Sequence, residues 1–335
     1  MASKPSIFIL NTGGLITAKK MGKKWHPGLY TTEELLKGLP KLKAIADIDT
    51  ANLFRIDSAQ MHPENWVTLA NFLHSKIRKY DGVVILHGTD TMTYTASALS
   101  FMLQGAGKPI VFTGAQYAPD QVGSDAQRNT SDAVKVAADS ELGETCIVFN
   151  RKILRGTRCR KVSDTDYDAF APAGIGPLGT VEHEVRLEPH ALRRKKSRPR
   201  LCAGVEPNVA LLKAHPGFNA GLLDCVGKLG LKGLVLEAYW STPPAQRNHL
   251  QGALANLARH LPIAVTREAF GGECGCAGDC FQEHGAGNLF SCRDMLTETA
   301  LTKLMWALSQ AKAPRKVGKL MQTNFAGEIT PPKKK

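Results

Sequence analysis

Aromatic residues are scarce in this sequence: phenylalanine, tryptophan and tyrosine make up 7% of its 335 residues. Surfaces that bind nucleic acid usually combine basic side chains with aromatic ones or carry a recognisable binding motif. The formal net charge is +13, but much of it lies in local runs at residues 19–24, 193–200 and 333–335. Because such runs are usually solvated surface, we do not expect nucleic acid to be a partner.

Long apolar runs are also lacking. A membrane-spanning helix needs about 18 or more consecutive apolar residues, and the sequence contains no such run. Its N-terminus passes directly into the strand-like residues 7–10, without the longer apolar segment and small-residue cleavage site of a secretory signal. We therefore expect a cytoplasmic protein that does not bind a membrane.

The length and the apolar runs predict two α/β domains. A single hydrophobic core usually stops growing near about 250 to 300 residues, and this chain is longer. Short apolar runs that do not alternate, separated by helical patterns, are typical of a parallel sheet covered on both faces. These runs lie at residues 7–10, 83–87, 109–113, 145–149 and 233–237.

A break in this pattern sets the expected domain boundaries. Residues 188–207 combine a basic run with three prolines and are interpreted as an exposed linker. We therefore predict an N-terminal domain at residues 1–187, with the larger, mostly parallel sheet flanked by helices. A smaller C-terminal α/β domain is predicted at residues 208–335.

Loops after the predicted strands contain residues suited to amide chemistry. In such sheets ligands bind beyond the carboxyl ends of the strands. Amide hydrolysis needs a nucleophile, a base, donors for the oxyanion and groups that hold the charged ends of the substrate. Thr89, Asp90 and Lys161 have side chains suited to the first two roles. Threonine and aspartate are also common in turns for local hydrogen-bonding reasons, so the residue types alone leave both interpretations open.

A series of motifs runs in order along nearly the whole chain, and the most specific is His-Gly-Thr-Asp-Thr at residues 87–91. The others include Thr12-Gly13-Gly14, Asp57-Ser58-Ala59-Gln60-Met61, Thr113-Gly114-Ala115-Gln116, Ser124-Asp125, residues 156–161, Asp168-Ala169-Phe170 and Thr297-Glu298. The series resembles the bacterial-type asparaginase and glutaminase family, and more closely its cytoplasmic, type I-like branch. The resemblance implies the two-domain asparaginase-like fold.

The resemblance also implies roles for individual residues. Ser58 corresponds to the residue that binds the α-carboxylate of the substrate, and Asp90 to the one that binds the α-ammonium. The carbonyl of Ala115 meets the leaving amide. The remaining substrate-binding positions are Ala59, Gly88 and Thr89.

Thr89, Asp90 and Lys161 together resemble the catalytic Thr-Asp-Lys set of the family, and Thr12 is a further catalytic candidate. The family requires no organic cofactor. Its catalytic elements are completed by the C-terminal domain of a neighbouring subunit, which implies a homodimer or homotetramer. The implied substrate is a small amide such as L-asparagine.

Two positions depart from the family pattern. The family's nucleophile is the last threonine of Thr-Gly-Gly-Thr, and here that position is Leu15, which has no group that attacks a carbonyl. A catalytic tyrosine follows on a mobile loop, and counting forward from Leu15 places Trp25 near it. An indole N–H donates a hydrogen bond but does not accept a proton. One catalytic set therefore looks degenerate while the other looks intact.

Three interpretations follow from this departure. The first is an amidohydrolase that converts the side-chain amide of L-asparagine or a related small amide to the acid and ammonia. Thr89 would attack, or else Thr12 or Thr17, with Tyr30 in place of the missing tyrosine. The second is a homologue that binds an amino acid or related molecule without hydrolysing it, in which Leu15 favours a more apolar ligand. The third is a structural or regulatory protein. The retained polar residues favour the first, with activity that is weak or altered.

A cysteine-rich stretch in the second domain allows two interpretations. Cys274, Cys276 and Cys280, with Cys292 or His284, provide the four ligands of a tetrahedral structural zinc. Their spacing is not that of a standard zinc finger, and reduced thiols in a loop are the alternative. Separately, Cys159 lies two residues before Lys161, where neighbouring arginines would favour its thiolate.

Overall fold

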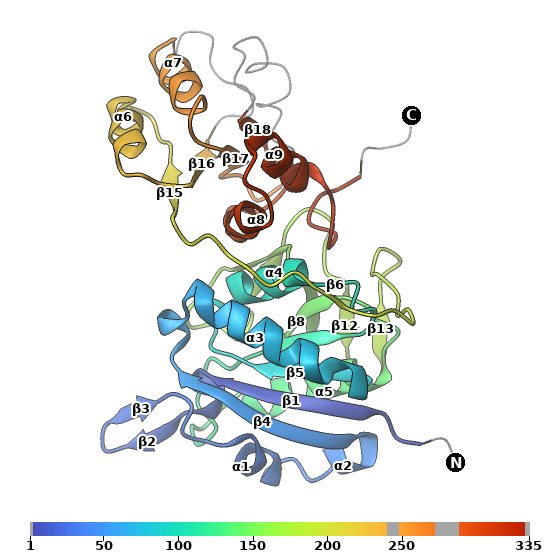
Figure 1. Cartoon of the computed structure of the whole chain (residues 1–335). Helices are drawn as coiled ribbons and strands as arrows, with labels where there is room; N and C mark the ends of the chain where they lie inside the picture. Colours follow the sequence, from blue (N-terminus) through green and yellow to red (C-terminus); the bar gives the residue numbers. More distant parts are fainter. Residues whose placement is uncertain (1–2, 240–247, 272–287, 332–335) are drawn as a thin grey trace. The chain divides into compact units, whose positions relative to one another are not determined.

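The computed structural model describes residues 3–239, 248–271 and 288–331 (Figure 1). The chain divides into two compact units, Met1–Ala203 and Gly204–Lys335. Each unit is built around its own sheet with helices packed against it. The predicted two-domain α/β class is confirmed.

The first unit contains an eight-stranded mixed sheet. Five neighbouring strands are parallel, four of them at predicted apolar runs, and an antiparallel end of three short strands continues the sheet beyond β8. In sheet order the strands are β13 (Val185–Leu187), β12 (Gly179–Val181), β9 (Lys152–Arg155), β8 (Thr145–Phe149), β7 (Ile110–Thr113), β5 (Gly82–Leu86), β1 (Ser6–Gly13) and β4 (Asp47–Ile56).

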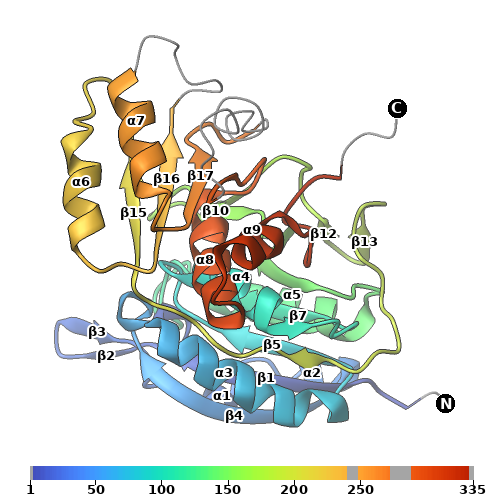
Figure 2. The ribbon, with the colours of Figure 1, turned by 45° about the horizontal axis from the view of Figure 1, so that its top comes forward.

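Helices cover both faces of this sheet (Figure 2). Successive residues of a strand point to opposite faces. On one face, Ile7 and Ile9 belong to a buried cluster that includes residues of the helices α1, α2 and α5. On the other, Phe8 stacks on Tyr80 and lies beside Phe72 of α3. The helices are α1 (Thr32–Lys37), α2 (Leu42–Ile45), α3 (Pro63–Lys76), α4 (Met92–Met102) and α5 (Ala126–Asp139).

Short elements fill the loops of the first unit. Three 3-10 turns, η1 (Leu15–Thr17), η2 (Ser58–Gln60) and η3 (Ile77–Lys79), follow β1, β4 and α3. Three two-stranded antiparallel pairs complete the unit. They are β2 (Lys19–Met21) with β3 (Lys24–His26), β10 (Cys159–Lys161) with β11 (Phe170–Pro172), and β6 (Leu103–Gln104) with β14 (Arg200–Leu201).

The segment predicted as an exposed linker is partly integrated into the first unit. Its residues 200–201 form β14, and the N–H of Arg194 donates to the carbonyl of Glu141 at 2.6 Å. The chain passes from the first unit to the second between Ala203 and Gly204.

The second unit is built on a four-stranded parallel sheet. Its strands are β15 (Val209–Lys213), β16 (Gly233–Ala238), β17 (Ile263–Arg267) and β18 (Leu289–Ser291), and its helices are α6 (Gly221–Lys228), α7 (Asn248–Leu257), α8 (Thr297–Gln310) and α9 (Pro314–Gln322). The ammonium of Lys303 in α8 is fully buried and contacts the carboxylate of Glu328 at 2.6 Å. This ion pair ties α8 to the turn that follows α9.

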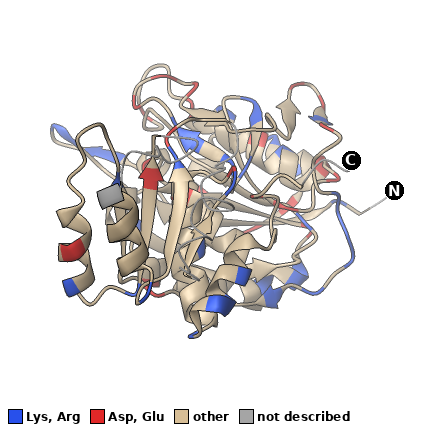
Figure 3. Ribbon diagram, turned by 90° about the horizontal axis from the view of Figure 1, so that it is seen from above, with Lys and Arg blue, Asp and Glu red and all other residues tan. Residues whose placement is uncertain are grey.

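The described residues can be compared with two expectations from composition, on membrane-spanning helices and on the distribution of positive charge. No helix in residues 3–239, 248–271 and 288–331 is long and apolar enough to cross a membrane. Lysine and arginine occur as several separate stretches rather than on one element (Figure 3).

Candidate active site

Three backbone segments meet closely beyond the carboxyl ends of the adjacent parallel strands β1 and β5. Gly14 follows β1 and has a φ of 80°, and a Cβ built on it would lie 2.3 Å from the Cα of Gly88. A Cβ on Gly88 would lie 2.6 Å from the Oγ of Ser58. Only glycine allows such an approach. The sequence Gly13-Gly14 and the Gly88 of the His-Gly-Thr-Asp-Thr block therefore place these three loops in contact.

A cavity of about 240 Å³ opens at this junction. It brings together most of the predicted substrate-binding and catalytic residues. The lining residues predicted from the sequence are Leu15, Ser58, Gly88, Thr89, Asp90, Ala115 and Lys161. The lining residues to which the sequence assigned no role are Gly14, Pro27, Asp57, Gln116 and Asp164.

Ser58 and Asp90 share one wall of this cavity. Ser58 begins η2, whose N-cap residue Asp57 accepts a hydrogen bond from the N–H of Ala59 at 2.9 Å. The Oγ of Ser58 accepts from the N–H of Asp90 at 3.2 Å, and its carbonyl accepts from the hydroxyl of Thr91 at 2.8 Å. These bonds hold a buried hydroxyl beside an accessible carboxylate, an arrangement suited to the two charged ends of an amino acid.

Lys161 lies between two carboxylates. Its Nζ is 2.6 Å from Asp90 Oδ1 and 2.7 Å from Asp164 Oδ1. Burial lowers the pKa of Lys161, but hydrogen bonds to Asp164 and Asp90 outweigh this effect and the pKa is raised. The ammonium in turn lowers the pKa of Asp164. Lys161 is therefore a firmly charged group that orients Asp90.

Thr89 presents a hydroxyl that is open to an incoming group. Its side chain is half-buried, and the hydroxyl has no hydrogen bond to any residue that the structure describes. The neighbouring position His87 is fully buried, with its ring Nδ1 2.7 Å from the carbonyl of Gly88. Burial lowers the pKa of His87 to about 4, partly opposed by that carbonyl, so the ring is neutral at physiological pH.

A buried carboxylate fixes another loop that lines the cavity. Asp125 accepts hydrogen bonds from the N–H groups of Gln116 and Tyr117 at 3.0 and 3.1 Å. It also accepts from the side-chain amide of Asn129 at 2.9 Å. These bonds hold Ala115 and Gln116 at the cavity. The motif Ser124-Asp125 was identified from the sequence, but only the structure shows that its carboxylate holds this loop.

Comparison with known proteins decides the family. The sequence matches the family profiles described as Asparaginase, N-terminal, over residues 6–193 and Glutaminase/Asparaginase C-terminal domain over residues 208–321. The chain belongs to the asparaginase family.

Several members of the asparaginase family are similar over almost the whole chain. L-asparaginase from Thermococcus kodakarensis is 32% identical, and the alignment covers 97% of this chain and 99% of the relative. Its solved structure has a TM-score of 0.86 over 98% of this chain and 100% of that chain. L-asparaginase I from Vibrio cholerae has a TM-score of 0.88 at 28% identity, again over 98% and 100%. One of the subunits of glutamyl-tRNA(Gln) amidotransferase from Pyrococcus furiosus is 35% identical over 98% of this chain and 77% of the relative.

The two positions predicted from the sequence to depart from the asparaginase-family pattern have different surroundings. Leu15 is the first residue of η1 and lines the cavity, so hydrocarbon occupies part of its wall. Trp25 lies in the β2–β3 hairpin and is not among the lining residues, whereas Pro27 just beyond it is.

The other hydroxyls proposed as nucleophile or base do not line the cavity. The hydroxyl of Thr12 is buried and donates to the carbonyl of Leu86 at 2.8 Å. Thr17 is also buried, and its hydroxyl donates to the side chain of Asn11 at 3.2 Å. The Tyr30 hydroxyl donates to Asp120 at 2.6 Å, and that bond, with burial, raises the pKa of Tyr30 to about 12. Ala59 is likewise not a lining residue.

The candidate zinc ligands Cys274, Cys276 and Cys280, with His284, lie outside the described residues. Cys292 is described and fully buried. In the described parts of the chain there is no group of three or more histidine, cysteine, aspartate or glutamate residues that could hold a metal. The zinc site stays a prediction. Cys159 is buried in β10 and is not a lining residue of the cavity.

Proposed function

We propose that this asparaginase-family protein hydrolyses the side-chain amide of L-asparagine or a related small amide to the acid and ammonia. The observation that carries the proposal is the single cavity shared by Ser58, Thr89, Asp90 and Lys161. In this proposal Asp90 would hold the ammonium and Ser58 the carboxylate of an amino acid. The side-chain amide of the bound amino acid would then reach the part of the cavity lined by Thr89 and Ala115.

Thr89 is the nucleophile in this proposal. Its hydroxyl oxygen attacks the amide carbon, the C–N bond breaks and ammonia leaves with the proton from the hydroxyl. Water then hydrolyses the resulting ester to the acid. Lys161 is the proposed base that takes this proton from the hydroxyl and passes it to the leaving ammonia. It does so only in its neutral form, and its raised pKa makes that form rare at neutral pH. We therefore expect slow hydrolysis that accelerates as the pH rises.

Ammonia release from asparagine, glutamine and related amides tests this proposal. Thr89→Ala should lower the rate by about a thousandfold or more, as loss of a covalent nucleophile typically does. Thr165→Ala is the matched control, because Thr165 is exposed in the loop after Lys161 and does not line the cavity. Equal activity in the parent and Thr89→Ala would refute the role of Thr89.

A second candidate function is binding without hydrolysis, and Leu15 in the cavity wall is the observation that favours it. In that case calorimetry detects amino-acid binding to the parent while no ammonia forms. Leu15→Thr would then introduce the missing hydroxyl and produce activity. No ligand binding and no ammonia release in any of these variants would leave only a structural or regulatory role.

A further inference from the structure

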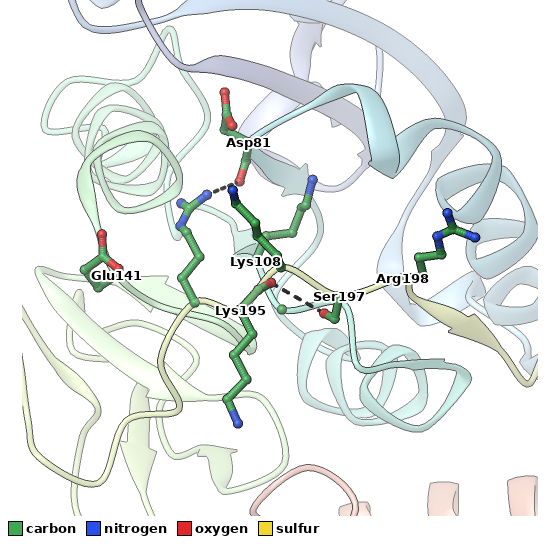
Figure 4. Close-up of a pocket in the computed structure, with 9 residues that line it drawn as sticks. Asp81, Lys108, Glu141, Lys195, Ser197 and Arg198 are labelled. Carbon is green, nitrogen blue, oxygen red and sulfur yellow. Dashed lines mark hydrogen bonds between the residues drawn. The ribbon is translucent and has the colours of Figure 1, made fainter. Parts of the chain in front are cut away.

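A second and larger cavity, of about 720 Å³, lies at the opposite edge of the same sheet. Asp81 immediately precedes β5, Lys108 precedes β7, and Glu141 precedes β8. The amino ends of parallel strands meet at one edge, so this cavity is separated from the candidate active site by the length of the strands, roughly 15 Å for five residues. Gly107 and residues 194–198 form the rest of its lining (Figure 4).

The backbone around this cavity is held in place. The N–H of Lys195 donates to the carbonyl of Gly107 at 2.9 Å, and the hydroxyl of Ser197 donates to the carbonyl of Gly105 at 2.6 Å. Gly107 has a φ of 63°, and a Cβ on it would lie 2.3 Å from the carbonyl oxygen of Lys195. The basic segment therefore lies on a fixed backbone, and glycine is required at the point of contact.

Two of the five cationic side chains in the lining are engaged by main-chain carbonyls. Lys108 donates to the carbonyls of Ile77, at 3.1 Å, and Tyr80. Arg194 donates to the carbonyl of Asp81 at 2.8 Å and to that of Ser140 at 3.2 Å. Figure 4 shows Asp81 and Lys108 close together, with the other labelled residues around them. These contacts anchor the basic segment to the edge of the sheet.

The other three cationic side chains, those of Lys195, Lys196 and Arg198, are exposed. None of them has a hydrogen bond or ion pair with a residue in the part of the chain that the structure describes. The cations in the lining outnumber its two carboxylates. One of these carboxylates, Asp81, already accepts from the N–H of Ser6 at 2.8 Å. The lining therefore has a net positive charge that its own carboxylates do not balance.

We propose that this cavity binds a linear chain of phosphates, either inorganic oligophosphate or the phosphate tail of a nucleotide. Several cations on one fixed backbone match the repeated charge of such a ligand, since lysine and arginine donate to phosphate oxygens. The volume lies in the range of small-molecule sites. The lining contains no aromatic residue on which a base would stack, so the phosphates rather than a base provide the recognition.

Calorimetric titration of the full chain with tripolyphosphate at low ionic strength tests the proposal. The test variant combines Lys195→Gln, Lys196→Gln and Arg198→Gln, and the matched control combines Lys20→Gln, Lys23→Gln and Lys24→Gln in the exposed β2–β3 hairpin. Both remove three positive charges. We expect the test variant to bind about tenfold or more weakly, in line with the loss of three exposed charge contacts, and the control to bind like the parent.

Further arms distinguish the sources of the ligand. If ATP binds as tightly as tripolyphosphate, the phosphate chain suffices, whereas tighter binding of ATP identifies a nucleotide. Added salt should weaken either interaction. The proposal is overturned if tripolyphosphate does not bind, if the test and control variants weaken equally, or if a structured RNA binds while tripolyphosphate does not.

Discussion

Lys161 shows how two carboxylates beside one ammonium restrict the chemistry available to a lysine. Asp90 and Asp164 contact the same ammonium at 2.6 and 2.7 Å, and both raise its pKa. A lysine in this setting is suited to orienting Asp90 and poorly suited to accepting a proton near neutral pH.

Replacing Asp164 should therefore move the pH dependence of activity. Asp164→Asn removes a group that raises the pKa of Lys161, so neutral lysine forms at lower pH and the rise of the amidase rate shifts toward lower pH. The measurement is the pH–rate profile of ammonia release. Asp166→Asn is the control, because that carboxylate bonds to Ser163 in the same loop. Unshifted profiles in both variants would show that Lys161 does not act as a base.

His87 predicts a separate pH effect, on stability. Its folded-state pKa of about 4 lies below the ordinary value of 6.5. The contribution of His87 to the free energy of unfolding is therefore fully present above a pH of about 6.5 and is lost as the pH falls toward about 4. Between about pH 7 and about pH 5 the parent should lose about 2 kcal/mol of unfolding free energy through this group.

Denaturant unfolding at the two pH values measures this loss. His87→Asn should lose less stability over the same interval than the parent, while a variant at the exposed His26, such as His26→Asn, should behave like the parent. An identical loss in the parent and His87→Asn would contradict the assignment to His87.

The sequence predicted a large part of the cavity, but on two different grounds. Thr89 and Asp90 lie in a motif soon after the buried strand β5, whereas Ser58 was predicted from the family resemblance alone, because β4 before it contains no buried run. Asp164 was missed because an exposed aspartate in an irregular loop has no periodic signal, and its contact with Lys161 depends on the path of the chain. Thr12 lies in an equally conspicuous motif, but its hydroxyl is used by the neighbouring strand. Its catalytic role stays a prediction.

At the scale of elements, the contact between the loops after β1 and β5 depends on glycine. Gly14→Ala should destabilise the first unit and impair ligand binding, because it adds a steric clash with Gly88 to the cost of a positive φ. Gly22→Ala is the matched control. Gly22 has a φ of 62°, but a Cβ there would meet nothing within 4 Å, so only the backbone cost of about 1 kcal/mol applies. Thermal unfolding of both variants checks this, and equal effects would argue against the close contact.

The ion pair that joins α8 to the turn after α9 should behave as a unit. Lys303→Met leaves the carboxylate of Glu328 buried without its cation, which costs about 3 to 5 kcal/mol. Adding Glu328→Gln should restore part of this loss, because the uncompensated charge is removed. Scanning calorimetry of the single and double variants provides the measurement. A double variant that is no more stable than Lys303→Met alone would contradict this account.

Elements with strong patterns were predicted well, and weakly patterned elements were missed. The apolar runs at residues 109–113 and 145–149, for example, lie at β7 and β8. By contrast, β4 alternates between half-buried and exposed positions, and β12 and β13 have three residues each. Such strands contain no continuous apolar run, so only their pairing in the sheet reveals them.

At the scale of the whole molecule, the chain contains two units that each have their own sheet and core. The family resemblance implies that neighbouring subunits complete the catalytic site, and we propose a homodimer or homotetramer that acts in the cytoplasm. Light scattering coupled to size-exclusion chromatography should give two or four times the chain mass of 36.3 kDa. A monomer that retains full amidase activity would refute the need for a second copy of the chain.

The contact between Gly14 and Gly88 also limits how this protein can be redesigned. On that side the cavity is bounded by main chain, so no side-chain substitution there enlarges the cavity or changes its polarity. Engineering of ligand preference is therefore confined to lining residues that have replaceable side chains, such as Leu15, Gln116 and Asp164.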